Sequence, residues 1–164
     1  MDLALHCPER IEKLILIDST GYPPKASAIE WFFRYPFVMR CALAFLNKRA
    51  VGWLLKKAVF FDPSLVTEKE IEGWMKPYSV KGSAQAAMEL RKVDFVMEEV
   101  IRKISQPTLI IWGEKDKVFP VEMARRFKAE MRDAALKIAT NCRHNPQEEK
   151  PEEINSLIKA FLLE

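Results

Sequence analysis

Two short runs of apolar residues constrain the fold of this chain more than any other feature. The first is LILI at 14–17, between a charged turn and the polar segment DSTG, and the second is TLIIW at 108–112, between Pro107 and Gly113. Runs that are apolar at almost every position predict strands covered on both faces, as parallel strands are. A third and weaker run, ALKIA at 135–139, is bounded by polar residues and is also predicted as a strand.

The segment between the first two strands predicts helices almost throughout. We expect helical structure over 26–60, which is rich in Trp, Phe, Leu and Ala and is interrupted at Pro36 and Gly52. Thr67, followed three residues later by Glu70, has the pattern of a helix N-cap. Further helices are expected at 83–91, 94–104, 120–131 and 151–163.

The order of these elements predicts an α/β fold with parallel pairing through crossovers. Residues 1–22 and 106–164 are expected to form the sheet with its flanking helices, and residues 23–105 an all-helical domain inserted between strands. About three strands make a small sheet, with open edges and faces short of cover, which predicts a homo-oligomer. Residues 2–7 resemble the last turns of a helix, so we expect the sequence to be part of a longer fold.

Composition narrows the classes of function. A chain of 164 residues with 49% hydrophobic residues can bury a compact core. The 26 Lys and Arg against 23 Asp and Glu are scattered, which argues against nucleic-acid binding. No apolar run approaches the roughly 20 residues of a membrane span, and no signal peptide is evident. Three distant cysteines indicate neither a zinc site nor a disulfide framework, so we expect a cytoplasmic protein without metal or cofactor.

Polar residues follow the second and third predicted strands. Asp116 lies just beyond the strand at 108–112, and His144 lies in the loop between the third strand and the last helix. The carboxyl ends of parallel strands meet at one edge of a sheet, so these side chains should converge. A carboxylate can orient an imidazole and stabilise its charged form while the imidazole accepts a proton from a nucleophile. We therefore predict Asp116 and His144 as the acid and base of a catalytic triad.

Simpler interpretations exist for each candidate residue. Asp116 could be an ordinary turn residue, and His144 a surface-loop histidine. Asp18, at the end of the first strand, is either an alternative acid or a strand-end cap. Cys142 could pair with His144, or it could be an inert, half-buried thiol. The aromatic residues of the helical segment could line a lipophilic pocket or form an ordinary core: Trp31, Phe32, Phe33, Phe37, Phe45, Trp53, Phe60 and Phe61.

Three segments resemble the α/β-hydrolase fold family, and together they span nearly the whole chain. WGEKDKVFP is similar to the segment after the seventh strand, which ends in the triad acid, and NCRHNPQEEKPEEIN is similar to the histidine loop. PERIEKLILIDSTGYPP is similar to the segment that leads from the nucleophile helix into the lid. The order of acid and histidine agrees with the family. The residues of these segments look most like those of the meta-cleavage-product hydrolases, which cleave carbon–carbon bonds, and of related esterases.

The resemblance implies a partial α/β-hydrolase core with an all-helical cap, acting on an ester or carbon–carbon bond of a small lipophilic substrate. The family's Gly-x-Ser-x-Gly motif is absent, as is the upstream His-Gly segment of the oxyanion hole. We expect the chain alone to be inactive and to need an N-terminal half supplied in trans. The alternative is a non-catalytic, self-associating or scaffold module.

A second departure from the family concerns the residue before the histidine. Arg143 stands where the family has glycine. A long cationic side chain replaces a residue that permits close approach, and its charge is expected to disfavour the imidazolium form of His144.

Overall fold

The structure is a computed structural model in which residues 1–22, 35, 46–90 and 98–164 are described. Its centre is a parallel sheet with the strand order β1-β2-β3, formed by β1 (Leu14–Ile17), β2 (Thr108–Gly113) and β3 (Ala134–Ala139). Thr108 of β2 pairs with Leu14 on one side and with Ala134 on the other. The predicted α/β fold with three parallel strands is therefore confirmed, with strand bounds within one residue of those expected.

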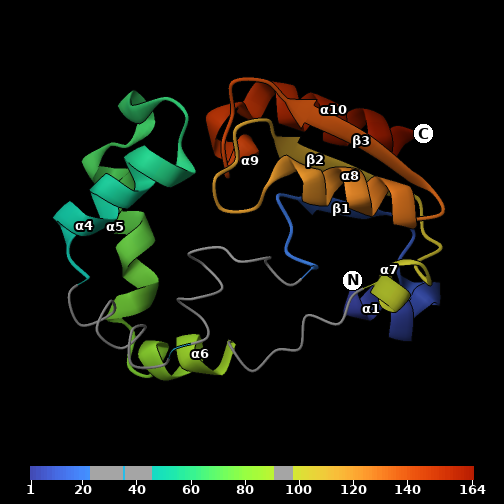
Figure 1. Ribbon diagram of the computed structural model, residues 1–164, viewed down its shortest axis with the longest axis horizontal. Coiled ribbons are helices and arrows are strands. Elements are labelled where there is room, and N and C mark those ends of the chain that lie inside the picture. The colour runs from blue at the N-terminus through green and yellow to red at the C-terminus, as the bar shows by residue number, and fades with distance from the viewer. Residues whose placement is uncertain (23–34, 36–45, 91–97) are drawn as a thin grey trace.

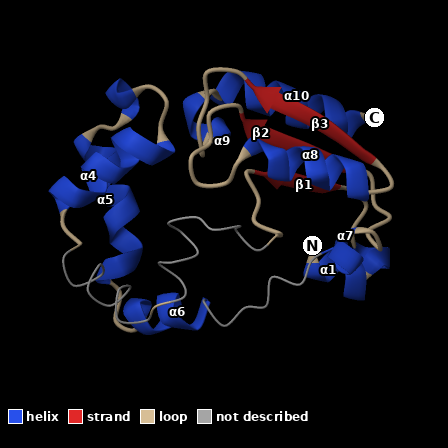
Figure 2. Ribbon diagram, in the orientation of Figure 1, coloured by secondary structure: helices blue, strands red, loops and turns tan. Residues whose placement is uncertain are grey.

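Two helices cover the two faces of the central strand (Figures 1 and 2). Ile110 and Trp112 pack in the same cluster as Phe127 of α8 (Val121–Glu130). The alternate side chains of β2 cluster with Ile154 of α10 (Pro151–Leu163). All six residues of β2 are buried, so the expected shortage of cover is wrong for this strand. It holds for the edge strand β1, where three of four residues are only half-buried.

Short helical elements complete the core: α1 (Asp2–His6), η1 (Pro8–Arg10), α7 (Glu98–Ile101) and α9 (Pro146–Glu149). The helix predicted over 94–104 is described as a helix only in α7, and residues 91–97 lie outside the described residues. After α7 the hydrogen bonds tighten to i,i+3 spacing, from Lys103 to Val100 and from Ile104 to Ile101. The chain then enters β2 through Pro107, which disfavours helical backbone in the residue before it.

The second group of helices packs around its own small core. Its elements are α4 (Lys48–Leu54), the π-helical turn η2 (Leu55–Val59), η3 (Pro63–Leu65), α5 (Glu68–Met75), η4 (Lys76–Ser79) and α6 (Ser83–Leu90). We call residues 46–90 the helical domain. The buried residues at its centre are Val51, Leu55, Val59, Phe60 and Val66. Figure 1 shows this domain beside the end of the sheet at which α9 begins.

The sequence predictions for this domain have mixed outcomes. Thr67 is the N-cap of α5, and its Oγ1 accepts a hydrogen bond from the Glu70 N–H at 3.2 Å, as predicted. The predicted interruption at Gly52 is wrong, because Gly52 lies buried inside α4. A Cβ at this position would lie 2.8 Å from Cδ1 of Ile71, so glycine allows α4 and α5 to approach closely. Pro36 and the aromatic residues at 31–33, 37 and 45 lie outside the described residues.

Phe60 and Trp53 show that the aromatic residues serve different purposes. Phe60 is 2% exposed in the core of the helical domain, whereas Trp53 is 64% exposed. Within the described residues, no helix has the length and apolar character that crossing a bilayer requires.

Candidate active site

Asp116 is held by its own turn, directly after β2. Its Oδ1 accepts hydrogen bonds from the N–H groups of Val118 at 2.7 Å and Phe119 at 3.1 Å. Its own N–H donates to the Gly113 carbonyl at 3.3 Å. The side chain is 0% exposed. These bonds join residues within three positions of one another, so the placement of the carboxylate is a local property of the turn.

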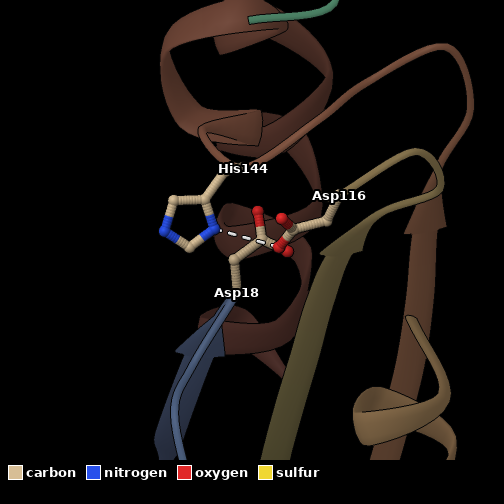
Figure 3. A group of neighbouring side chains, drawn as sticks. All are labelled: Asp18, Asp116 and His144. Carbon is tan, nitrogen blue, oxygen red and sulfur yellow. Dashed lines mark hydrogen bonds and ion pairs between the residues drawn. The ribbon is translucent and has the colours of Figure 1, made fainter. Parts of the chain in front are cut away.

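His144 lies against this carboxylate, as Figure 3 shows. Its Nδ1 is 2.9 Å from Oδ2 of Asp116, and its side chain is 20% exposed. The ring also packs edge-on against Phe119, with 5.4 Å between centroids. An ionised carboxylate only accepts hydrogen bonds, so Nδ1 carries the proton and Nε2 is left as the acceptor. Nε2 points away from the carboxylates in Figure 3, so it is not engaged by either of them.

Gly113, at the end of β2, allows the two loops to meet. A Cβ built on Gly113 would lie 1.7 Å from the carbonyl oxygen of Arg143, so only glycine fits beneath the histidine loop, residues 140–145. Lys115 N–H donates to the Cys142 carbonyl at 2.8 Å and ties the same loop to the turn. Sequence reasoning treated Gly113 only as the end of a strand. Its position just before the acid turn was the available signal.

Asp18, the alternative acid, enters the same cluster from the end of β1 (Figure 3). Its backbone is left-handed, with φ of 39°, and its Oδ1 accepts a hydrogen bond from Gly113 N–H at 2.9 Å. Its Oδ2 has no hydrogen-bond partner in the described part of the chain. Burial raises the pKa of Asp18 to about 8, and the charges of Asp116 and Glu149 act in the same direction, against the Gly113 hydrogen bond. Asp116, not Asp18, makes the hydrogen bond to the histidine.

These three side chains also offer potential metal ligands. One ligand atom from each of Asp18, Asp116 and His144 lies within 4.8 Å of the others. The imidazole nitrogen nearest the carboxylates is already hydrogen-bonded to Asp116, however. The arrangement is that of an oriented imidazole beside a buried acid, which suits proton transfer.

Arg143 joins the histidine loop to the helical domain. Its guanidinium is directed to the helical domain, where Nη1 donates to three carbonyl oxygens, those of Lys56 (3.0 Å), Lys57 (3.0 Å) and Phe60 (2.7 Å). The positive charge therefore faces backbone carbonyls, and its expected effect on the imidazolium form of His144 stays a prediction.

Cys142 is more deeply buried than the half-buried thiol that we expected. It is 0% exposed, and its Sγ lies 3.4 Å from Oε1 of Glu149. Burial, followed by the charge and hydrogen bond of Glu149, raises the pKa of this thiol well above its usual range. Because the thiolate is the nucleophilic form, a Cys–His dyad is disfavoured.

Two surface hollows lie on the helical domain. One, of about 350 Å³, is lined by residues that include Lys48, Glu72 and Tyr78. The other, of about 420 Å³, lies where α5 faces Glu148 and includes Trp74. Neither is lined by Asp116 or His144.

The sequence is similar to a known protein family and to several of its members. A family model described as alpha/beta hydrolase fold matches residues 3–151. The chain is 29% identical over 166 residues to the uncharacterized hydrolase YugF of Bacillus subtilis (strain 168). The alignment covers 99% of this chain and 60% of that protein. The chain is 25% identical over 173 residues to a 2-hydroxy-6-oxo-6-phenylhexa-2,4-dienoate hydrolase of Burkholderia cepacia, covering 99% and 58%.

Solved structures show the same fold. A meta-cleavage product hydrolase from Pseudomonas fluorescens IP01 superposes with a TM-score of 0.79 at 22% identity, covering 98% of this chain and 59% of that chain. A serine hydrolase from a Cycloclasticus bacterium gives a TM-score of 0.76 at 21% identity, covering 98% and 58%. The chain therefore spans about 60% of the length of the first of these relatives.

Proposed function

Because the chain belongs to the α/β-hydrolase fold family, we propose that Asp116 and His144 are the acid and base of a serine-type catalytic triad. The 2.9 Å contact between Asp116 Oδ2 and His144 Nδ1, with Nε2 pointing away from both carboxylates, is the observation that carries this proposal. In such a triad Nε2 takes the proton of the serine hydroxyl as the serine oxygen attacks a carbonyl. It later delivers this proton to the leaving group, while the buried carboxylate stabilises the imidazolium.

The nucleophile in this scheme comes from residues other than these 164. None of the five glycines brackets a serine in a Gly-x-Ser-x-Gly motif, and the His-Gly segment of the oxyanion hole is also absent from the sequence. Without a nucleophile and an oxyanion hole, an oriented acid–base pair provides little rate enhancement. We therefore expect these residues alone to show no turnover.

The proposed substrate is a small lipophilic molecule with an ester or a carbon–carbon bond next to a carbonyl. Support for the carbonyl comes from the 6-oxo group in the names of relatives that are 2-hydroxy-6-oxo-6-phenylhexa-2,4-dienoate and 2-hydroxy-6-oxononadienedioate hydrolases, and support for apolar character comes from the phenyl group of the first. Both bond types suit one mechanism, because in each the serine oxygen adds to a carbonyl and the histidine protonates the departing oxygen or carbon.

The experiment is a complementation assay. The chain is mixed with a polypeptide that carries the Gly-x-Ser-x-Gly half of a relative, and hydrolysis of a chromogenic ester is followed. We expect turnover from the mixture and none from either part. His144→Ala should reduce the rate of the mixture by about 10³-fold or more, whereas Arg125→Ala, on the exposed side of α8, should leave it unchanged. A rate that survives His144→Ala, or proven association without turnover, would count against the proposal.

A second candidate function is association through the sheet edge. β1 lies at one edge of the described sheet, and its apolar residues Leu14, Ile15 and Ile17 are only half-buried. An open strand edge with apolar residues favours pairing with another strand, supplied by a second copy or by a separate N-terminal half. Sedimentation should show a self-associating chain, and Ile15→Lys should weaken association. A well-behaved monomer at high concentration would contradict this candidate.

A further inference from the structure

The histidine loop is bound to the helical domain by contacts that do not involve Asp116. The backbone N–H of His144 donates to the Val59 carbonyl at 3.0 Å. Nearby, the backbone N–H of Phe61 donates to Oε2 of Glu149 at 2.6 Å. Segments more than 80 positions apart in the sequence thus share a backbone-mediated seam, which we define as residues 56–61 on one side and 142–149 on the other.

Arg143 makes the largest number of hydrogen bonds across this seam. The π-helical turn η2 ends at Val59, and the last carbonyls of a helical turn lack partners within the helix. The Arg143 Nη1 donates to the carbonyls of residues 56, 57 and 60, so a cation lies at the negative end of the turn. Its guanidinium also lies 5.9 Å from the ring centre of Phe61. The three bonds from Nη1 to the carbonyls are charge-assisted hydrogen bonds, which are stronger than neutral ones.

The backbone of Arg143 is fixed as firmly as its side chain. Its N–H donates to Oε1 of Glu149 at 2.7 Å, and its carbonyl lies directly over Gly113. The residue is therefore clamped between the end of β2 and the helical domain. Because His144 is the next residue, a displacement of the helical domain would move the imidazole relative to Asp116.

From these contacts we propose that Arg143 is a positioning residue that couples the helical domain to His144. The proposal rests on the proposed role of His144 as the base. It adds that the ring keeps its place beside Asp116 only while Arg143 caps the turn at 55–60. Glycine, which the resemblance to the family implies at this position, would lack the side chain that makes this connection.

The test compares Arg143→Met, Arg143→Lys and the matched control Arg125→Ala with the unchanged 164-residue chain by NMR. Two quantities are measured: the hydrogen-exchange rates of the Phe61 and His144 backbone amides, and the rate at which the His144 Nδ1 proton exchanges with water. Amides of β2 report whether each variant is folded, and His6, the other histidine, serves as an internal reference.

We expect Arg143→Met to accelerate exchange of both seam amides and of the Nδ1 proton by on the order of tenfold or more, the factor that the loss of a charge-assisted hydrogen bond produces. Arg143→Lys, which keeps the charge, should give intermediate rates, and Arg125→Ala should match the unchanged chain. Should Arg143→Met fail to fold, the same two rates in Arg143→Lys decide.

Faster amide exchange with an unchanged Nδ1 proton would overturn the proposal, because Arg143 would then stabilise the seam without positioning the histidine. Unchanged rates throughout would overturn it as well. Failure of the proposed function is distinguishable, since it would appear in the unchanged chain as a His144 ring without a protected Nδ1 proton.

Discussion

The acid and the base of the candidate site are held in place by different means. Asp116 is fixed by hydrogen bonds to residues two and three positions away in its own turn. His144 is fixed from three directions: the carboxylate of Asp116, the backbone over Gly113, and the helical domain through Val59 and Arg143. The position of the acid is thus a local property, whereas the position of the base depends on how two parts of the chain pack.

This contrast bears on how such a site could respond to change. A turn closed by its own side chain re-forms whenever its residues are present. A loop clamped between a strand end and a helical domain keeps its geometry only if both neighbours stay in place. Perturbations of the helical domain should therefore reach His144 before they reach Asp116.

Gly113→Ala should have the largest effect on the contact between the acid turn and the histidine loop. The added methyl group would lie 1.7 Å from the Arg143 carbonyl and would force the two loops apart. Overpacking against backbone should lower the free energy of unfolding by about 3 kcal/mol or more, as measured by urea denaturation. Gly73→Ala is the matched control: the position is inside α5, and a Cβ there would lie within 4 Å of no atom of the described residues outside the adjoining backbone of the helix. The control should be stabilised by about 0.5–1 kcal/mol. Equal effects of the two substitutions would refute the close-approach argument.

Asp116→Ala should remove the hydrogen bonds within the acid turn and leave the seam intact. It leaves the N–H groups of Val118 and Phe119 without their acceptor, which should cost about 1–3 kcal/mol of unfolding free energy. His144→Ala removes a side chain that is one-fifth exposed and leaves the turn bonds in place, so its cost should be smaller. Hydrogen exchange at the Phe61 amide should be unaffected by Asp116→Ala. Loss of protection at Phe61 would show that the acid turn also supports the seam.

Asp18→Asn tests whether β1 contributes a titrating group beneath the pair. The folded-state pKa of Asp18 is raised to about 8, so between about pH 4 and pH 8 the folded state binds a proton that the unfolded state has released. The free energy of unfolding should therefore fall as pH rises through this range, by at most about 1.4 kcal/mol per pH unit. Asparagine keeps an acceptor for Gly113 N–H but does not titrate. Urea denaturation from pH 5 to pH 9 should show a flatter profile for the variant, and parallel profiles would rule out this source of pH dependence.

The smallest effect concerns the thiols. Cys142 is buried under the histidine loop with a raised pKa, whereas Cys7 is partly exposed. Iodoacetamide should modify Cys7 well before Cys142, and peptide mass mapping can follow each of them separately from Cys41. Comparable rates for Cys7 and Cys142 would indicate that the histidine loop opens readily.

The features that could be predicted from sequence are those encoded by neighbouring residues. Consecutive apolar residues located β1 and β2, polar residues at both ends located the weaker run of β3, and helical spacing of apolar residues predicted α10. Asp116 was recognisable because its turn follows a buried strand. The prediction that Gly52 interrupts the helix was wrong because glycine is required there by the close contact with Ile71, on another helix.

The seam could not be predicted either, because it also depends on contacts between residues that are distant in the sequence. Arg143 bonds to carbonyls 83 to 87 positions away, and backbone carbonyls carry no side-chain signature in a sequence. The one available signal was the departure from glycine before the histidine. That departure indicated a charge next to His144, but it gave no indication of the backbone carbonyls that the side chain binds.

The central claim is that Asp116 orients His144 so that Nε2 is available as a base. Nitrogen-15 NMR of the two imidazole rings above their titration range tests it directly. The account predicts that His144 is held as the Nδ1–H tautomer and that Asp116→Ala abolishes this preference while His6 is unchanged. A His144 ring that carries its proton on Nε2, or that is insensitive to Asp116→Ala, would contradict the account.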